Sequence, residues 1–278
     1  MAAASIKTLL DGFYSSFDFT ERVKNDPIEF PHRYSNPQDI EAVSLIAASF
    51  AYGKVELFKP VTGRILSKMG ASPADFLLEF DIKRHAGLFS GISYRFNKNE
   101  DITAFIYILH RAATAKGSIK NAFVQKYNGS IYDMLGGVAE YMLSIDMTAV
   151  YGSNVRPPGL LQLFPSPFKG SACKRFNMFL RWMVRDADID FGIWPEIPKN
   201  SLIIPLDTHI ARIARCLGLT HRKSNDWKTA AEITQALKRL DPDDPLKYDF
   251  ALCHHGISGA CGAARNEDAC KTCAIYAG

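Results

Sequence analysis

An aspartate stands at the head of the most strongly patterned segment of this 278-residue chain. Residues 204–219 read IPLDTHIARIARCLGL, and Asp207 or Thr208 occupies the place of a helix N-cap. Apolar residues then recur at helical spacing until a glycine closes the segment: Ile210, Ile213, Ala214, Leu217 and Gly218. A carboxylate here can serve catalysis, but caps are far commoner than catalytic aspartates, so the residues alone favour a cap.

The cysteines suggest a second kind of chemistry. Four of the six crowd the last 26 residues: Cys253, Cys261, Cys270 and Cys273. A Cys-x-x-Cys pair with two more cysteines nearby is typical of a metal site, and His254 or His255 could complete a zinc site. The alternative is a loop of ordinary thiols that binds no metal. Disulfides are disfavoured, because the chain begins without an export signal.

Basic residues gather in two windows that contain no Asp or Glu. The first window, residues 147–185, holds Arg156, Lys169, Lys174, Arg175, Arg181 and Arg185. The second window, residues 208–225, holds His209, Arg212, Arg215, His221, Arg222 and Lys223. Together they could form one positive surface for phosphates. The alternative is two solvated helix faces.

Helical periodicity dominates the elements that must position these groups. Residues 39–53, 101–117, 131–145 and 224–242 read as helices, with Ser130 and the stretch 224–226 as cap candidates. Strand signals are sparse, since the short run LIIPL from Leu202 is interrupted by proline. The pattern predicts an all-α protein of roughly ten or more helices.

Composition is ordinary for a globular protein that buries a core. Hydrophobic residues make up 47% of the chain and charged residues 22%, and the net charge is +4. There is no run of about 20 apolar residues, so we expect no membrane span. These features predict a cytoplasmic protein.

The aspartate segment resembles a motif of the helix-hairpin-helix (HhH-GPD) DNA glycosylases, the superfamily of endonuclease III and the 8-oxoguanine glycosylases. In that motif Val-Asp-Thr-His-Val opens a helix reading roughly Arg-x-x-x-Arg-Leu-Gly. Here Leu206-Asp207-Thr208-His209-Ile210 leads into Arg212, Arg215, Leu217 and Gly218. The resemblance implies that Asp207 is the catalytic aspartate.

The same superfamily carries a hairpin and a nucleophilic lysine upstream. Lys174-Arg175-Phe176-Asn177 resembles the stretch in which that lysine begins Lys-Thr-Ala-Asn, so the resemblance implies that Lys174 is the nucleophile. It implies a set of DNA contacts: Lys169, Gly170, Ser171, Arg175, Arg181, His209 and Arg212. This sequence departs from the pattern in two ways. The Gly-x-Gly hairpin retains only Gly170, and Lys174 and Asp207 lie 33 positions apart (207 minus 174), which is wider than usual.

Other blocks extend the likeness over about two-thirds of the chain. Ser93–Phe96 resembles a Tyr-Arg pair of the 8-oxoguanine enzymes. The blocks around Cys173–Arg185 and Pro205–His209 resemble an uncharacterised bacterial domain-of-unknown-function family within the superfamily. The cysteine tail resembles the iron–sulfur loop of endonuclease III, which implies a [4Fe-4S] cluster on Cys253, Cys261, Cys270 and Cys273; zinc, or no cofactor at all, remains the alternative.

The resemblance implies two helical subdomains with a DNA-binding cleft between them. One, residues 40–185, would be a helical barrel ending in the degenerate hairpin. The other would combine residues 1–39 with residues 186–278. The chain would act as a monomer associated with the nucleoid.

The implied activity is that of a base-excision glycosylase and AP lyase. Double-stranded DNA with a damaged, oxidised base would be the partner, and Lys174 would form a Schiff base while Asp207 takes its proton. The first alternative is a catalytically silent nucleic-acid-binding protein on the same scaffold. A metal-dependent hydrolase ranks last, because His254 and His255 beside Cys253 have no carboxylate companion except Asp249.

Overall fold

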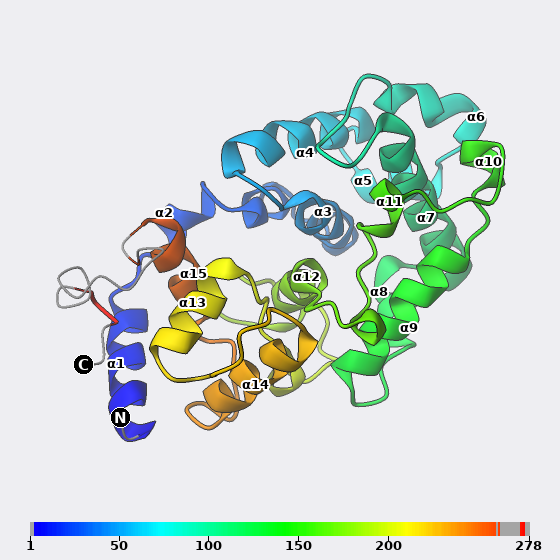
Figure 1. Cartoon of the computed structure of the whole chain (residues 1–278). Coiled ribbons are helices and arrows are strands. Elements are labelled where there is room, and N and C mark those ends of the chain that lie inside the picture. Colours follow the sequence, from blue (N-terminus) through cyan, green and yellow to red (C-terminus); the bar gives the residue numbers. More distant parts are fainter. Residues whose placement is uncertain (1–2, 260, 262–272, 276–278) are drawn as a thin grey trace. The chain divides into compact units, whose positions relative to one another are not determined.

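The chain was analysed as a computed structural model that describes residues 3–259, 261 and 273–275 (Figure 1). Helices and their connecting loops make up these residues, which contain no β-strand and only two isolated bridges, Tyr94 with Asn97 and Ser171 with Asp226. The prediction of an all-α protein is therefore confirmed. None of the helices in the described ranges has both the length and the apolar character that a membrane crossing requires.

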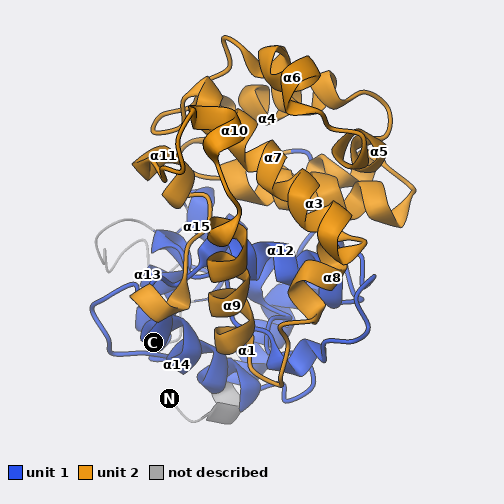
Figure 2. Ribbon diagram, turned by 90° about the vertical axis from the view of Figure 1, so that its right-hand side faces the viewer, with its two compact units in different colours: residues 1–24, 170–278 blue, residues 25–169 orange. Residues whose placement is uncertain are grey.

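The described chain divides into two compact units (Figure 2). Unit 1 combines residues 1–24 with residues 170–278, and unit 2 is the continuous stretch 25–169. From the sequence, the divisions were expected at residues 40 and 186. The later division falls at residue 170 because the next residues pair with unit 1: Trp227 N donates to Gly170 O, and Ser171 bridges Asp226.

Unit 2 is built around one central helix. Its helices are α3 (Pro37–Phe50), α4 (Val55–Met69), α5 (Pro73–Leu78), α6 (Ile82–His85), α7 (Asn99–Lys116), α8 (Ile119–Val124), α9 (Ile131–Ser144), α10 (Thr148–Tyr151) and α11 (Pro158–Leu161), with 3₁₀ turns η1 (Pro27–Glu29), η2 (Pro31–Arg33), η3 (Ala86–Phe89) and η4 (Pro167–Lys169). Residues 101–109 of α7 are all buried, and α5, α8, α9, α10 and α11 pack against this helix. An apolar helix of this kind must lie in a core.

Local capping signals set the ends of these helices. The Ser130 side chain accepts from Asp133 N at the start of α9, as predicted, and Gly117 ends α7 in the left-handed conformation. Helix α3 begins two residues before the predicted Asp39. Asn36 is its cap and Pro37 its first residue, because proline fits the first turn without loss of a hydrogen bond.

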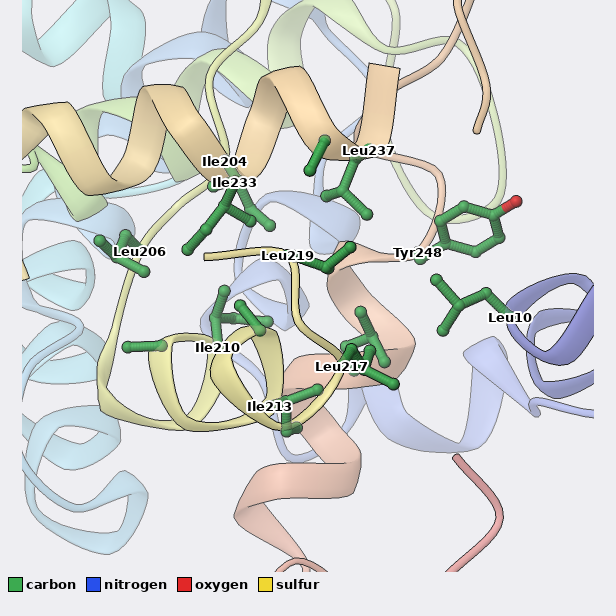
Figure 3. Close-up of a cluster of buried hydrophobic side chains, with 14 of the residues drawn as sticks. Leu10, Ile204, Leu206, Ile210, Ile213, Leu217, Leu219, Ile233, Leu237 and Tyr248 are labelled. Carbon is green, nitrogen blue, oxygen red and sulfur yellow. The ribbon is translucent and has the colours of Figure 1, made fainter. Parts of the chain in front are cut away.

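Unit 1 carries the segments singled out in the sequence. Its helices are α1 (Ala3–Ser15), α2 (Phe19–Val23), α12 (Lys174–Val184), α13 (Thr208–Cys216), α14 (Trp227–Lys238) and α15 (Asp249–Ile257), with one 3₁₀ turn, η5 (Lys199–Ser201). The predicted stripe of α13 is buried in a core shared with α14, α15 and α1 (Figure 3): Ile210, Ile213, Ala214 and Leu217. The run from Leu202 to Leu206 forms no regular secondary structure and pairs with no strand. It delivers Ile204 and Leu206 to the same core.

Helix α1 is held against the rest of unit 1 by polar contacts as well as by Leu10, which lies in the core. Asp11 accepts from Lys247 Nζ at 2.8 Å and from Tyr248 Oη at 2.7 Å. The Lys247 hydrogen bond, followed by that of Tyr248, holds the pKa of Asp11 well below its usual range. The N-terminal helix therefore packs into a unit most of whose residues, 170–278, lie more than 150 positions away in the sequence.

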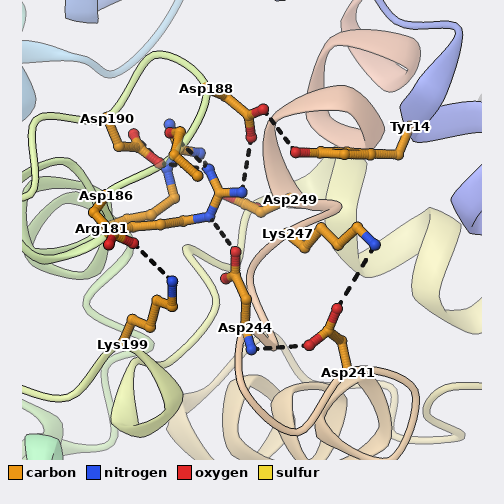
Figure 4. Close-up of polar contacts among 12 residues, drawn as sticks. Tyr14, Arg181, Asp186, Asp188, Asp190, Lys199, Asp241, Asp244, Lys247 and Asp249 are labelled. Atoms are coloured by element: carbon orange, nitrogen blue, oxygen red, sulfur yellow. Dashed lines mark hydrogen bonds and ion pairs between the residues drawn. The ribbon is translucent and has the colours of Figure 1, made fainter.

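Two arginines of the first acid-free window lie inside unit 1 (Figure 4). Arg181 Nη1 is 2.6 Å from Asp249 Oδ2, and its Nε is 3.2 Å from Asp190 Oδ1. Arg185 pairs with the second oxygen of Asp190 at 3.1 Å. It also pairs with Asp188 and Asp244, at 2.7 and 2.8 Å. Buried charges of this kind persist only when they are paired.

Removing one partner of this network is expected to be costly. Arg181→Met should lower the free energy of unfolding by about 3–5 kcal/mol, because it leaves the buried carboxylate of Asp249 without its arginine and leaves Asp190 with Arg185 alone. Burial raises the pKa of both carboxyls in the native protein, that of Asp249 to about 6. Lowering the pH should therefore reduce this loss of unfolding free energy, since the unpaired carboxylate of Asp249 then takes up a proton.

Urea unfolding measures this change. The matched control is Lys199→Met, which removes the exposed ion pair with Asp186 and should cost less than about 1 kcal/mol. Equal losses in the two variants would contradict a structural role for the buried network.

Candidate active site

A left-handed turn sets the position of Lys174. Cys173 precedes the lysine with φ 49°, a conformation that costs a non-glycine residue free energy and often occurs at functional sites. The turn is held by two hydrogen bonds: Cys173 N donates to Ser171 Oγ, and Asn177 Nδ2 donates to Ala172 O. Lys174 is thus the first residue of α12 and follows a turn that hydrogen bonds hold in place. Burial raises the pKa of the Cys173 thiol to about 12, so this neighbour is no nucleophile at neutral pH.

Asp207 uses its two oxygens for different purposes. Oδ1 accepts from the backbone N–H groups of His209 and Ile210, both at 2.9 Å, and so caps α13. The sequence prediction of a cap is confirmed. Oδ2 points to other partners, since Lys174 Nζ and Cys253 Sγ each lie 3.6 Å from it. The cap and a chemical role are therefore compatible, because the cap fixes the carboxylate and leaves one oxygen available.

The fold brings Lys174 and Asp207 together across 33 positions of sequence. Their separation of 3.6 Å is an ion-pair distance and is longer than a hydrogen bond between these atoms. The lysine side chain is 32% exposed and the aspartate 16%, so the pair is partly desolvated yet open to a ligand. A nucleophilic amine beside a carboxylate able to accept its proton is the arrangement that covalent catalysis requires.

Cys253 also belongs to this cluster, although it was not expected here from the sequence. The cysteine was predicted to be a metal ligand, whereas its thiol here donates to Asp207 Oδ2. Local sequence held no signal for this contact, because Cys253 lies on α15 and reaches Asp207 only through the packing of α15 on α13.

A second carboxylate, that of Asp249, lies close enough to be influenced by the charge of Asp207. Asp249 is fully buried at the start of α15, and burial is the main cause that raises its pKa to about 6. The Arg181 guanidinium opposes this shift, while the negative charge of Asp207 adds to it. The negative charge of Asp207 therefore acts on the buried carboxyl of Asp249.

The residues predicted to contact DNA divide into two groups. Lys169 and Gly170 are exposed, and Ser171, Arg175 and His209 are half-buried, so a ligand can reach them. Arg181 cannot serve this purpose, because its buried guanidinium is paired with Asp190 and Asp249. That prediction is wrong, since the acidic partners come from segments outside the acid-free window. Arg212 is half-buried and donates to His209 Nδ1, Gly256 O and Cys261 Sγ.

Other arginines of the two windows also serve the fold. In unit 2, Arg156 donates to the carbonyls of Leu143 and Ile145 at the end of α9. In unit 1, Arg215 donates to the carbonyls of Arg222 and Lys223 and so closes the loop after α13. The two acid-free windows therefore present fewer exposed positive charges than their composition predicts.

The cysteine tail can be followed only in part. Cys270 lies outside the described residues. Cys261 Sγ accepts from Arg212 Nε, Cys273 Sγ lies 3.3 Å from His255 Nε2, and Cys253 faces Asp207. Within the residues that the structure describes, no three His, Cys, Asp or Glu side chains gather as a metal site would need. The donor set of a [4Fe-4S] cluster is thus incomplete among them, and the cluster stays a prediction.

Unit 2 presents an exposed aromatic ring on a hydrogen-bonded turn. Tyr94 and Asn97 exchange two backbone hydrogen bonds, both at 2.8 Å, and leave Arg95 and Phe96 at the tip. Arg95 has φ 51°, and the Phe96 side chain is 65% exposed. Tyr52 Oη donates to Asn97 Oδ1 and so stabilises the turn with a further hydrogen bond. The turn therefore holds a large apolar ring in solvent, where it gains nothing for folding.

Comparison with known sequences identifies one family. Its description is a protein of unknown function, DUF2400, and its sequence model matches residues 26–258. No match was found among curated proteins or among solved structures. The matched residues include Lys174, Asp207 and Cys253 and amount to well over half of the chain. The chain therefore belongs to the DUF2400 family.

Proposed function

We propose that this protein is a base-excision DNA glycosylase and AP lyase that acts on an oxidised base through a lysine Schiff base. The observation that carries the proposal is the approach of Lys174 Nζ to within 3.6 Å of Asp207 Oδ2 in a partly desolvated site. The likeness of both segments to the helix-hairpin-helix glycosylases supports it. We also propose that the protein has the two-subdomain architecture of that superfamily, with a DNA-binding cleft.

The chemistry begins when the target base leaves the helical stack, because its glycosidic carbon is otherwise out of reach. Asp207 Oδ2 takes a proton from Lys174 Nζ, and the amine forms a bond to the anomeric carbon. The glycosidic C–N bond breaks, and its electron pair leaves with the base, which is then protonated. Opening of the sugar ring gives a Schiff base, from which elimination of the 3′ phosphate cleaves the strand.

The position of Asp207 suits two parts of this reaction. Two backbone N–H groups hold Oδ1, so Oδ2 stays directed at the lysine without reorganisation. Its negative charge also stabilises the positive charge that develops on the sugar as the base departs.

A catalytically silent DNA-binding protein is the second candidate. One observation favours it: the hairpin retains Gly170 (φ +80°) as its single glycine, whereas the superfamily has Gly-x-Gly. A silent protein would bind phosphates through this loop and leave the Lys174–Asp207 ion pair unused.

A duplex panel separates the two candidates. The full chain is incubated with duplexes that each carry one damaged base or one abasic site, in the presence and absence of borohydride. Base release and a covalent protein–DNA band on at least one duplex are the result expected of the glycosylase. Binding without release or trapping on any duplex would replace the proposal with the silent DNA-binding protein.

The exposed Phe96 on the turn of unit 2 is expected to contact DNA. Phe96→Ala should lower the affinity for damaged duplex by about ten-fold, because stacking of a base on an aromatic ring contributes on the order of 1–3 kcal/mol. Stability should hardly change, since the ring is exposed. Leu78→Ala, which removes another exposed apolar side chain of unit 2, is the matched control. Equal affinities for the two variants in a fluorescence-anisotropy titration would exclude the turn as a DNA contact.

A further inference from the structure

One oxygen of the candidate active site has two neighbours of different chemistry. Asp207 Oδ2 lies 3.6 Å from Lys174 Nζ and 3.6 Å from Cys253 Sγ. A thiol is a weak hydrogen-bond donor and a carboxylate is a strong acceptor. The Cys253 thiol therefore competes with the ammonium group for the oxygen that the cap leaves available.

The packing of helix α15 fixes the position of this thiol. The buried ion pair between Arg181 and Asp249 joins α12 to α15 at 2.6 Å. Asp249 and Cys253 are four residues apart and so lie on one face of α15. Near the other end of the helix, Gly256 allows a close approach to α13, since a Cβ there would lie 2.6 Å from His209 Cβ.

The distance between the ion-pair atoms indicates what the thiol does. A lysine that donates directly to a carboxylate lies about 2.7–2.9 Å from it, whereas Lys174 Nζ stays at 3.6 Å from Oδ2. An amine in a tight ion pair is a poor nucleophile, because its lone pair is protonated and its position is occupied. A second donor on the same oxygen weakens the hold of the carboxylate on the amine.

We propose that Cys253 is a positioning residue of this site, whose thiol holds Asp207 Oδ2 and prevents Lys174 from closing onto it as a tight ion pair. Its catalytic consequence rests on the proposed glycosylase function. The assignment also replaces the predicted role of Cys253 as a metal ligand.

Other charged or titratable groups stand on the elements that meet here, and all remain unchanged in the variants described below. They are Arg175 and Arg181 on α12, His209, Arg212 and Arg215 on α13, and Asp249, His254 and His255 on α15.

The test measures the reactivity of Lys174 without DNA. The full chain is treated at neutral pH with propionaldehyde and cyanoborohydride, and the alkylation rate of Lys174 is followed by peptide mass spectrometry. The exposed Lys228 on α14 serves as internal reference. The variants are Cys253→Ala, which removes the donor, and Cys253→Ser, which keeps one. Cys216→Ala, at an exposed cysteine of unit 1, is the control.

Cys253→Ala is expected to slow the alkylation of Lys174 by about three- to ten-fold, the change that one hydrogen bond of ordinary net strength produces. Cys253→Ser should stay within about two-fold of the wild type, as should Cys216→Ala. Iron and zinc contents should be equal in the wild type and Cys253→Ser.

Three results would overturn the proposal. They are equal slowing in the Ala and Ser variants, an unchanged rate in the Ala variant, and loss of bound metal in Cys253→Ser. A Lys174 that reacts no faster than Lys228 in any variant would also overturn it, since there would be no activated amine to position. Failure of the duplex panel alone would instead remove the proposed function, because the aldehyde reaction uses no DNA.

Discussion

Replacing Lys174 with glutamine should abolish covalent trapping on DNA and lower the rate of strand cleavage by at least about 10³-fold. The Lys174 amine is the group placed beside the Asp207 carboxylate, so its loss removes the atom that would bond to the sugar. DNA affinity should fall by less than about ten-fold, because at most one cationic contact with a phosphate disappears. Borohydride trapping measures the first quantity and fluorescence anisotropy the second.

Lys228→Gln is the matched control for this change. It removes an exposed lysine of α14 from the same unit and should leave trapping unaltered. A covalent band of wild-type intensity in Lys174→Gln would show that another amine is the nucleophile, and it would remove the proposed mechanism.

The second large effect is expected at Asp207, where two substitutions separate the cap from the chemistry. Asp207→Asn should lower the rate of base release by about 10²–10⁴-fold, because the amide cannot accept the lysine proton. Its stability should match that of the wild type, since asparagine caps a helix as well as aspartate does. Asp207→Ala should lose the same activity and, in addition, about 1 kcal/mol of unfolding free energy.

Single-turnover base release and urea unfolding measure the two effects of Asp207 separately. Asp226→Asn, at the cap of α14, is the control for a cap whose ion partner is a partly exposed arginine, Arg222, rather than Lys174. It should leave base release unchanged and cost at most about 1 kcal/mol of unfolding free energy, because only a partly exposed ion pair is lost. If Asp207→Asn released the base at the wild-type rate, the carboxylate would be a cap and nothing more.

The helices themselves were accessible from sequence because their signals are local. Ser130 begins α9, and Asp226 begins α14 by accepting from Thr229 N. The buried stripe of α13 follows from its helical spacing. A capping hydrogen bond or a repeat of 3.6 residues involves neighbours within one or two turns, so nearby residues suffice to predict it.

Charge was harder to interpret, because the partner of a charged residue can come from any part of the chain. Arg181 and Arg185 lie in a window without acids, and the sequence analysis placed Arg181 on a DNA-binding surface. In the fold both are buried against carboxylates that follow the window, at positions 188, 190, 244 and 249. Composition within a window therefore could not predict whether its arginines would be exposed.

The sequence by itself determined that the described chain is helical, the approximate positions of four of its longer helices, and that Asp207 or Thr208 begins another. Only the tertiary structure decided that Lys174 and Cys253 both lie beside Oδ2 of Asp207, the oxygen that does not cap the helix. The first set depends on interactions within a few residues, which the order of amino acids specifies directly. The second depends on how α12, α13 and α15 pack, and packing is a property of the whole core.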